Sequence, residues 1–134
     1  MSFFVSNFKW LMLISGLLTC SMFLGLFAPQ SSLLSNFGET MVGTAANEII
    51  IRNWSALIGL IGIMLIYGAF VEPVRKFALV IAGMSKAIFI TLVLCYGKQY
   101  MSFGAGTAVI ADSIMIVLYL AYLIASRSNT DQVR

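Results

Sequence analysis

Apolar residues fill four long stretches of the chain, and polar or charged residues gather between them. The stretches cover residues 10–28, 54–71, 77–96 and 108–125. Each is close to the length of about 20 residues that an α-helix needs to cross the hydrocarbon core of a bilayer. Backbone groups in lipid must form their hydrogen bonds within the segment, so the four stretches are predicted to be helices rather than strands.

The connections between the stretches predict how the helices are arranged. The short turns favour an all-α, integral membrane fold, with four antiparallel transmembrane helices in an up-down-up-down bundle that forms one domain over residues 1–134. The long connection, residues 29–53, carries apolar residues at a rough helical spacing among Ser, Asn, Gly and Thr. This pattern is typical of a short amphipathic helix, and an ordered loop packed on the helix ends explains it equally well.

The composition also indicates a membrane protein. Of the 134 residues, 60% are hydrophobic and 10% are charged, whereas soluble domains hold about 25% charged residues. A soluble globule of this size could not cover its surface with so few charges, which excludes most soluble enzymes and nucleic-acid readers. The net charge of +3 comes from scattered residues, so no nucleic-acid partner is expected.

Lys and Arg residues beside the stretches predict an orientation. The richer side holds Lys9, Arg75, Lys76, Arg127 and Arg134, and the poorer side holds Arg52 and Lys98. Cytoplasmic loops carry the excess of positive residues. Both termini are therefore expected in the cytoplasm, and residues 29–53 outside the membrane on the other side.

The chain lacks residues that several kinds of catalytic and metal sites require. The chain has no His, so the common metal sites and a Ser-His or Cys-His nucleophile cannot form. The two cysteines, Cys20 and Cys95, lie in separate apolar stretches without CxxC spacing. No metal site and no cofactor are expected.

Lys86 is the first candidate for a functional site, because it lies near the centre of the third stretch. A lysine there costs about 2.5–3.5 kcal/mol on insertion scales and should face the bundle interior. Its side chain should lean toward the cytoplasmic half, near the hydroxyls of Tyr67, Tyr119 and Ser15. Loss of hydration would favour the neutral amine, which suits proton-coupled transport or capture of an anion. The presence of a lysine here is equally explained by a structural role, in which the side chain forms a hydrogen bond or extends to water.

Asp112 is the second intramembrane candidate, and we expect it not to contact Lys86. By helix rise it should lie about two turns nearer the outside, and the two side chains should lean apart because their helices run in opposite directions. Arg52, at the outer start of the second helix, is the better partner, with Glu48 one turn before it. We expect a structural ion-pair cluster of Arg52 and Asp112, with Glu48 as an optional member.

Small residues at helical spacing predict where helices touch. The stripes comprise Ser21 and Gly25; Ser55, Gly59 and Gly62; and Ala78, Ala82, Gly83 and Ala87. Such residues let helices approach closely in lipid. Contacts within the bundle and a homodimer seam both agree with this pattern.

A further set of residues resembles a known family. It starts with Arg52-Asn53-Trp54 and continues through Gly59, Tyr67-Gly68-Ala69-Phe70, Pro73-x-Arg75 and the helix with Lys86. Over roughly three-quarters of the chain this pattern is similar to the DoxX-like family of small four-helix membrane proteins. The resemblance implies a bacterial inner (plasma) membrane location. It also implies a link to quinone-associated sulfur oxidation or a role as an accessory or chaperone-like subunit, and it transfers no catalytic residue.

We therefore expect a non-enzymatic membrane protein, either an accessory subunit or a module that binds a small apolar ligand. The expected partners are membrane lipid, an apolar small molecule such as a quinone, and a second copy or a larger membrane complex. One alternative is a small, dimeric transporter with Lys86 as its proton or anion site. Another is a quinone- or lipid-linked membrane enzyme, whose acid–base chemistry would depend on Lys86 and tyrosines alone.

Overall fold

The computed structural model describes residues 2–131, which are helical apart from short turns and contain no strand. Arg134, one of the residues used to predict the orientation, lies outside the described residues. The long helices are α1 (Ser2–Cys20), α4 (Ala45–Phe70), α5 (Glu72–Tyr96) and α6 (Gly104–Asp131). The short elements are η1 (Ser21–Phe23), α2 (Leu24–Phe27), α3 (Pro29–Phe37) and η2 (Lys98–Ser102).

The predicted all-α membrane fold is confirmed. Within the described residues, four helical stretches are long and apolar enough to cross a membrane, namely Phe3–Phe27, Ala45–Phe70, Glu72–Tyr96 and Gly104–Ser128. Large apolar side chains are exposed along all of them, as lipid-facing surfaces require. The chain is therefore a multi-pass membrane protein.

The helices extend beyond the apolar stretches that predicted them. α4 begins at Ala45 rather than near residue 54, because the Thr44 side chain accepts a hydrogen bond from the backbone N–H of Asn47 and caps the helix. α6 begins at Gly104 rather than near residue 108. Hydropathy marks the apolar part of a helix, whereas capping residues and turns set its ends.

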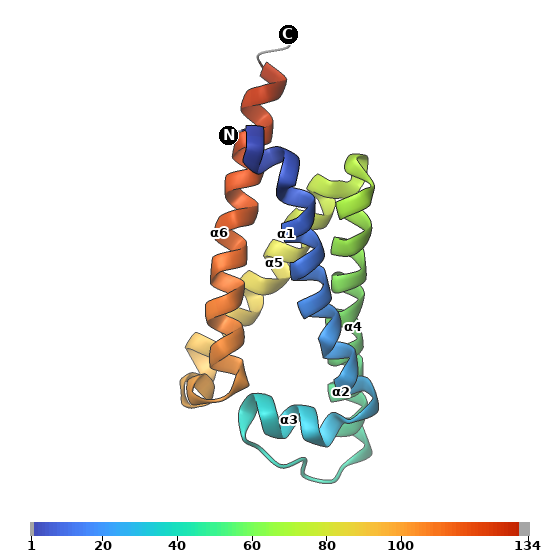
Figure 1. Cartoon of the computed structure of the whole chain (residues 1–134). Helices are drawn as coiled ribbons and strands as arrows, with labels where there is room; N and C mark the ends of the chain where they lie inside the picture. Colours follow the sequence, from blue (N-terminus) through green and yellow to red (C-terminus); the bar gives the residue numbers. More distant parts are fainter. Residues whose placement is uncertain (1, 132–134) are drawn as a thin grey trace.

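The two ends of the bundle differ in what covers them. One end of the bundle, here called the terminal end, holds the start of α1, the C-terminal end of α6 and the turn at Val71 (Figure 1). α3 crosses the opposite end, here called the α3 end, and packs against both α4 and α6. Of the two structures left open for residues 29–53, a helix is present, and it ends at Gly38, whose φ of 67° is left-handed.

α1 and the following α2 pack along α4 at predicted small residues. A Cβ added to Gly62 on α4 would lie 2.6 Å from the backbone nitrogen of Cys20 on α1, and one added to Gly25 on α2 would clash with Oγ of Ser55. Gly62, Gly25 and Ser55 therefore make contacts within the chain. In Figure 1 α1 crosses from beside α6 at the terminal end toward α4 at the α3 end.

A dense core fills the half of the bundle at the terminal end. Phe8, Met12, Leu65 and Leu79 come from three helices, and each is at most 1% exposed. The ring of Phe8 stacks on that of Tyr122, with centroids 4.1 Å apart. This core joins α1 to α6 and closes that half of the bundle.

The Pro73-x-Arg75 motif holds the turn at the terminal end. Arg75 donates from Nε to the carbonyl of Gly68 at 3.0 Å and from an Nη atom to that of Ala69 at 2.8 Å. These carbonyls belong to the last turn of α4, where carbonyl groups lack helical partners. Arg75 therefore has a structural function in joining α4 to α5.

Candidate functional site

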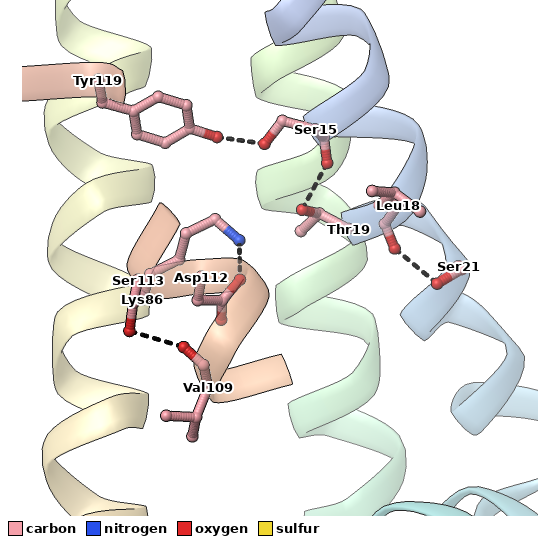
Figure 2. A network of polar contacts seen from close by, with 9 residues as sticks. All are labelled: Ser15, Leu18, Thr19, Ser21, Lys86, Val109, Asp112, Ser113 and Tyr119. Carbon is pink, nitrogen blue, oxygen red and sulfur yellow. Dashed lines mark hydrogen bonds and ion pairs between the residues drawn. The ribbon is translucent and has the colours of Figure 1, made fainter. Parts of the chain in front are cut away.

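Lys86 and Asp112 form an ion pair inside the bundle. Nζ of Lys86, on α5, lies 2.5 Å from Oδ1 of Asp112, on α6, and the side chains are 10% and 19% exposed. Figure 2 shows both side chains on the side that faces α1. The expectation that these residues do not touch is wrong.

The error comes from the ends of the helices. At about 1.5 Å per residue, Asp112 lies about 12 Å along α6 from Gly104, and Lys86 lies about 15 Å along α5 from Tyr96. Gly104 and Tyr96 both lie at the α3 end, so the depths differ by about 3 Å rather than by two turns. The long lysine stem spans that difference, although the two side chains start from helices of opposite direction.

Arg52 does not pair with Asp112, so that part of the predicted cluster is also wrong. Arg52 lies 2.6 Å from the Glu48 carboxylate, one turn earlier on the same helix, and also donates to the carbonyl of Leu26 in α2. The early start of α4 places both residues on one helical face, while Asp112 is bound to Lys86. The Arg52–Glu48 pair therefore joins α4 to α2 and is separate from the intramembrane pair.

Of the three hydroxyl groups predicted near Lys86, that of Ser15 belongs to the same cavity wall, that of Tyr119 is bonded to Ser15, and that of Tyr67 lies elsewhere. Tyr67 is 58% exposed on α4 and is not among the residues around Lys86. Ser15 and Tyr119, each 1% exposed, form a hydrogen bond with each other, between α1 and α6. Because Asp112 is the acceptor for Lys86, the two hydroxyls satisfy one another instead.

A cavity of about 330 Å³ lies between the ion pair and α3. Most of its wall is apolar, including Met22, Phe37, Trp54, Ile58, Phe89 and Met115. Lys86, Asp112, Ser15 and Thr19 add polar groups to the wall. Binding pockets for small molecules have volumes of about 300–1,000 Å³ and mostly apolar walls with a few polar groups. The cavity has the size and the lining of such a pocket.

Both ends of the cavity are covered. At the end toward the termini, the Ser15–Tyr119 hydrogen bond and the core around Met12 separate it from the terminal end. At the other end, Phe37 of α3 packs against the rings of Trp54 and Tyr100, at centroid distances of 6.0 and 5.3 Å. α3 thus forms a cap over the cavity.

The ion pair leaves unused hydrogen-bonding capacity at the wall of the cavity. Within residues 2–131, Lys86 donates to one partner although an ammonium has three N–H groups, and Oδ2 of Asp112 has no protein partner. A carbonyl or hydroxyl group in the cavity could therefore accept from Lys86 or donate to Asp112. The same residues hold no group of three or more Cys, Asp or Glu side chains placed to bind a metal ion.

The sequence did not predict that Trp54 and Phe37 would contribute to the cavity wall. Trp54 looks like an interface anchor at the end of an apolar stretch, and Phe37 like part of an amphipathic segment, so neither carries a separate signal.

Comparisons of the chain with models of protein families, with curated proteins and with solved structures find no match. The function is therefore argued from the cavity and its ion pair.

Proposed function

We propose that the protein is a non-enzymatic membrane module that binds a small, largely apolar molecule in this cavity. The observation that supports the proposal is the Lys86–Asp112 pair in the wall of an otherwise mostly apolar cavity of about 330 Å³. Ionisable residues inside a membrane are costly and commonly mark functional sites. An ion pair that lines a cavity can contact a bound molecule, whereas a pair sealed in the core cannot.

The packing of the bundle favours binding over transport. A transporter needs a route from its site to each side of the membrane, and the half of the bundle at the terminal end is closed. There, Phe8, Met12 and Leu65 are at most 1% exposed, and Tyr119 is bonded to Ser15 beside the cavity. Catalysis by Lys86 is disfavoured as well, because the amine is held by the Asp112 carboxylate.

The proposal also includes an orientation. With the basic residues of the terminal end in the cytoplasm, α3 and the cavity lie toward the outer face of a bacterial inner membrane. The resemblance to the DoxX-like family agrees with such a small four-helix protein. An apolar molecule dissolved in that membrane, such as a quinone, is the kind of ligand that we propose.

The two tryptophans allow a direct test. Trp54 lines the cavity, whereas Trp10 is 58% exposed on α1 and is not part of the cavity wall. In the Trp10→Phe variant, Trp54 is the single tryptophan, and a decyl-tailed benzoquinone that enters the cavity should quench its fluorescence. We expect quenching that saturates as the quinone is titrated into nanodiscs containing the variant.

The matched control is Trp54→Phe, which keeps only Trp10. A quinone that merely dissolves in the lipid should quench Trp10 in proportion to its concentration, without saturation. Equal, non-saturating quenching of both variants would contradict the proposed function.

A further inference from the structure

Some of the residues that line the cavity are also exposed at the side of the bundle. Leu18 on α1 is 60% exposed, and Ser21 on η1 and Thr107 near the start of α6 are exposed as well. The rest of the cavity wall is buried or half-buried. The opening of the cavity therefore lies between α1–η1 and α6, and we call these three residues the portal.

The portal results from the path of α1. Toward the terminal end α1 is held to α6 by the Phe8–Tyr122 stack and the Ser15–Tyr119 hydrogen bond. Toward the α3 end α1 leaves α6 and follows α4, as Figure 1 shows. Leu18 and Ser21 lie within the span Phe3–Phe27, and Thr107 lies within the span Gly104–Ser128. The portal therefore faces the acyl chains of the half of the membrane at the α3 end.

We infer that the ligand of this cavity is a membrane amphipath with an uncharged, oxygen-bearing ring and a hydrocarbon tail. Its ring lies beside Lys86 and Asp112, and its tail leaves through the portal into the lipid. This inference rests on the proposed function and adds the class of the ligand and its route of entry.

The balanced charges of the Lys86–Asp112 pair favour an uncharged head group. The Asp112 carboxylate already balances the charge of Lys86 at 2.5 Å, so an anionic head would face the carboxylate and a cationic head would face the amine. An uncharged ring with carbonyl or hydroxyl oxygens accepts from the remaining N–H groups without an added charge. The rings of Phe37, Trp54 and Phe89 in the wall suit a flat head group.

The closed ends of the cavity and its limited volume explain why the tail lies outside it, in the lipid. α3 covers the α3 end and the core closes the other side, so a molecule from the lipid reaches the cavity through the portal. About 330 Å³ is near the lower limit for a pocket, which accommodates a ring but not a long chain as well. The tail therefore remains outside the cavity.

Photolabelling of the wild-type protein tests this arrangement. The probe is a benzoquinone with a decyl tail that carries a diazirine close to the ring. We expect labelling at Leu18, Ser21 and Thr107 that is lost when excess unlabelled decyl-tailed quinone is added. Ile110, which is 62% exposed on α6 and does not line the cavity, is the control, because contact with bulk lipid gives labelling there that does not compete.

The possible results of these experiments distinguish failure of the inferred route from failure of the proposed binding function. Competed labelling at the portal supports both. Gly38 ends α3, and Phe103, which follows η2, lies against it at the α3 end. Saturable quenching of Trp54 together with competed labelling at Gly38 or Phe103 would overturn the lateral route and leave the binding function intact. Quenching that does not saturate, with labelling that does not compete at any position, would overturn the binding function itself.

A second comparison tests the head group. Decyl sulfate has the same tail length with an anionic head, and we expect it to leave the labelling at the portal unchanged. Loss of that labelling with decyl sulfate at the concentration that is effective for the quinone would overturn an uncharged head group.

Discussion

Removal of the Lys86 amine should destabilise the fold by leaving a carboxylate in the membrane without its partner. Lys86→Met keeps most of the length of the side chain and removes the ion pair with Asp112. Asp112→Asn removes the charge on the other side and leaves the amine unpaired. The double variant removes both charges, so neither group is left without its partner.

The magnitudes follow from the burial of the pair. Loss of one partner of a buried pair costs about 3–5 kcal/mol, because the other charge stays buried. The Asp112 side chain is 19% exposed at the cavity, which reduces the cost. We therefore expect each single variant to lose about 3 kcal/mol of the free energy of unfolding. The double variant leaves no unpaired charge, so its loss should be no larger than that of either single variant, which makes it smaller than the sum of the single losses by about 3 kcal/mol.

Equilibrium unfolding in mixed detergent micelles, followed by far-UV circular dichroism, measures all three variants. Lys98→Met is the matched control, because Lys98 is exposed in η2 and lies outside the cavity wall, and its effect should stay within about 0.5 kcal/mol. Strictly additive losses in the double variant would refute the reasoning, since independent residues give additive changes.

Three further variants test other contacts. Tyr119→Phe leaves the buried Ser15 hydroxyl without its partner and should lower the free energy of unfolding by about 1–3 kcal/mol, whereas the exposed Tyr67→Phe should change it by less than about 0.5 kcal/mol. Arg75→Met removes the hydrogen bonds to the end of α4 and should cost about 2 kcal/mol in the same unfolding assay, well above Lys76→Met. Gly62→Val should separate α1 from α4 at Cys20, and a lower thermal midpoint than wild type checks this. Unchanged stability in any of these would contradict the corresponding contact.

The sequence predicted the fold because lipid imposes simple rules. Apolar length and the need to pair backbone groups were enough to predict four membrane-crossing helices. The ends of α4 and α6 were predicted less well, because Thr44 and Gly104 lie outside the apolar stretches.

The candidate site was predicted as separate residues rather than as an arrangement. Lys86 and Asp112 stood out because charges are rare in a bilayer, but their pairing depends on depth, and an error of one turn at the start of α6 was enough to separate them. The hydroxyl group of Tyr67 was misplaced for another reason. Lipid-facing and interior positions are both apolar in a membrane helix, so the pattern could not distinguish exposed Tyr67 from buried Tyr119.

The cavity could not be predicted from the pattern at all. It depends on the divergence of α1 from α6 toward the α3 end and on the position of α3 across the bundle. Both are consequences of packing between segments distant in the sequence. The small residues of the first and second apolar stretches indicated close contact, but not the space that this contact leaves beside α6.

The most direct measurement compares Trp54 quenching with and without the ion pair. In the Trp10→Phe background, decyl-tailed benzoquinone is titrated into the intact protein and into the variant that also carries Lys86→Met and Asp112→Asn. A hydrogen bond to a charged group contributes about 1.5–3 kcal/mol, so the account predicts saturable quenching whose apparent Kd rises about tenfold or more when the pair is removed. Superimposable titration curves from two folded proteins would contradict the claim that Lys86 and Asp112 bind the ligand.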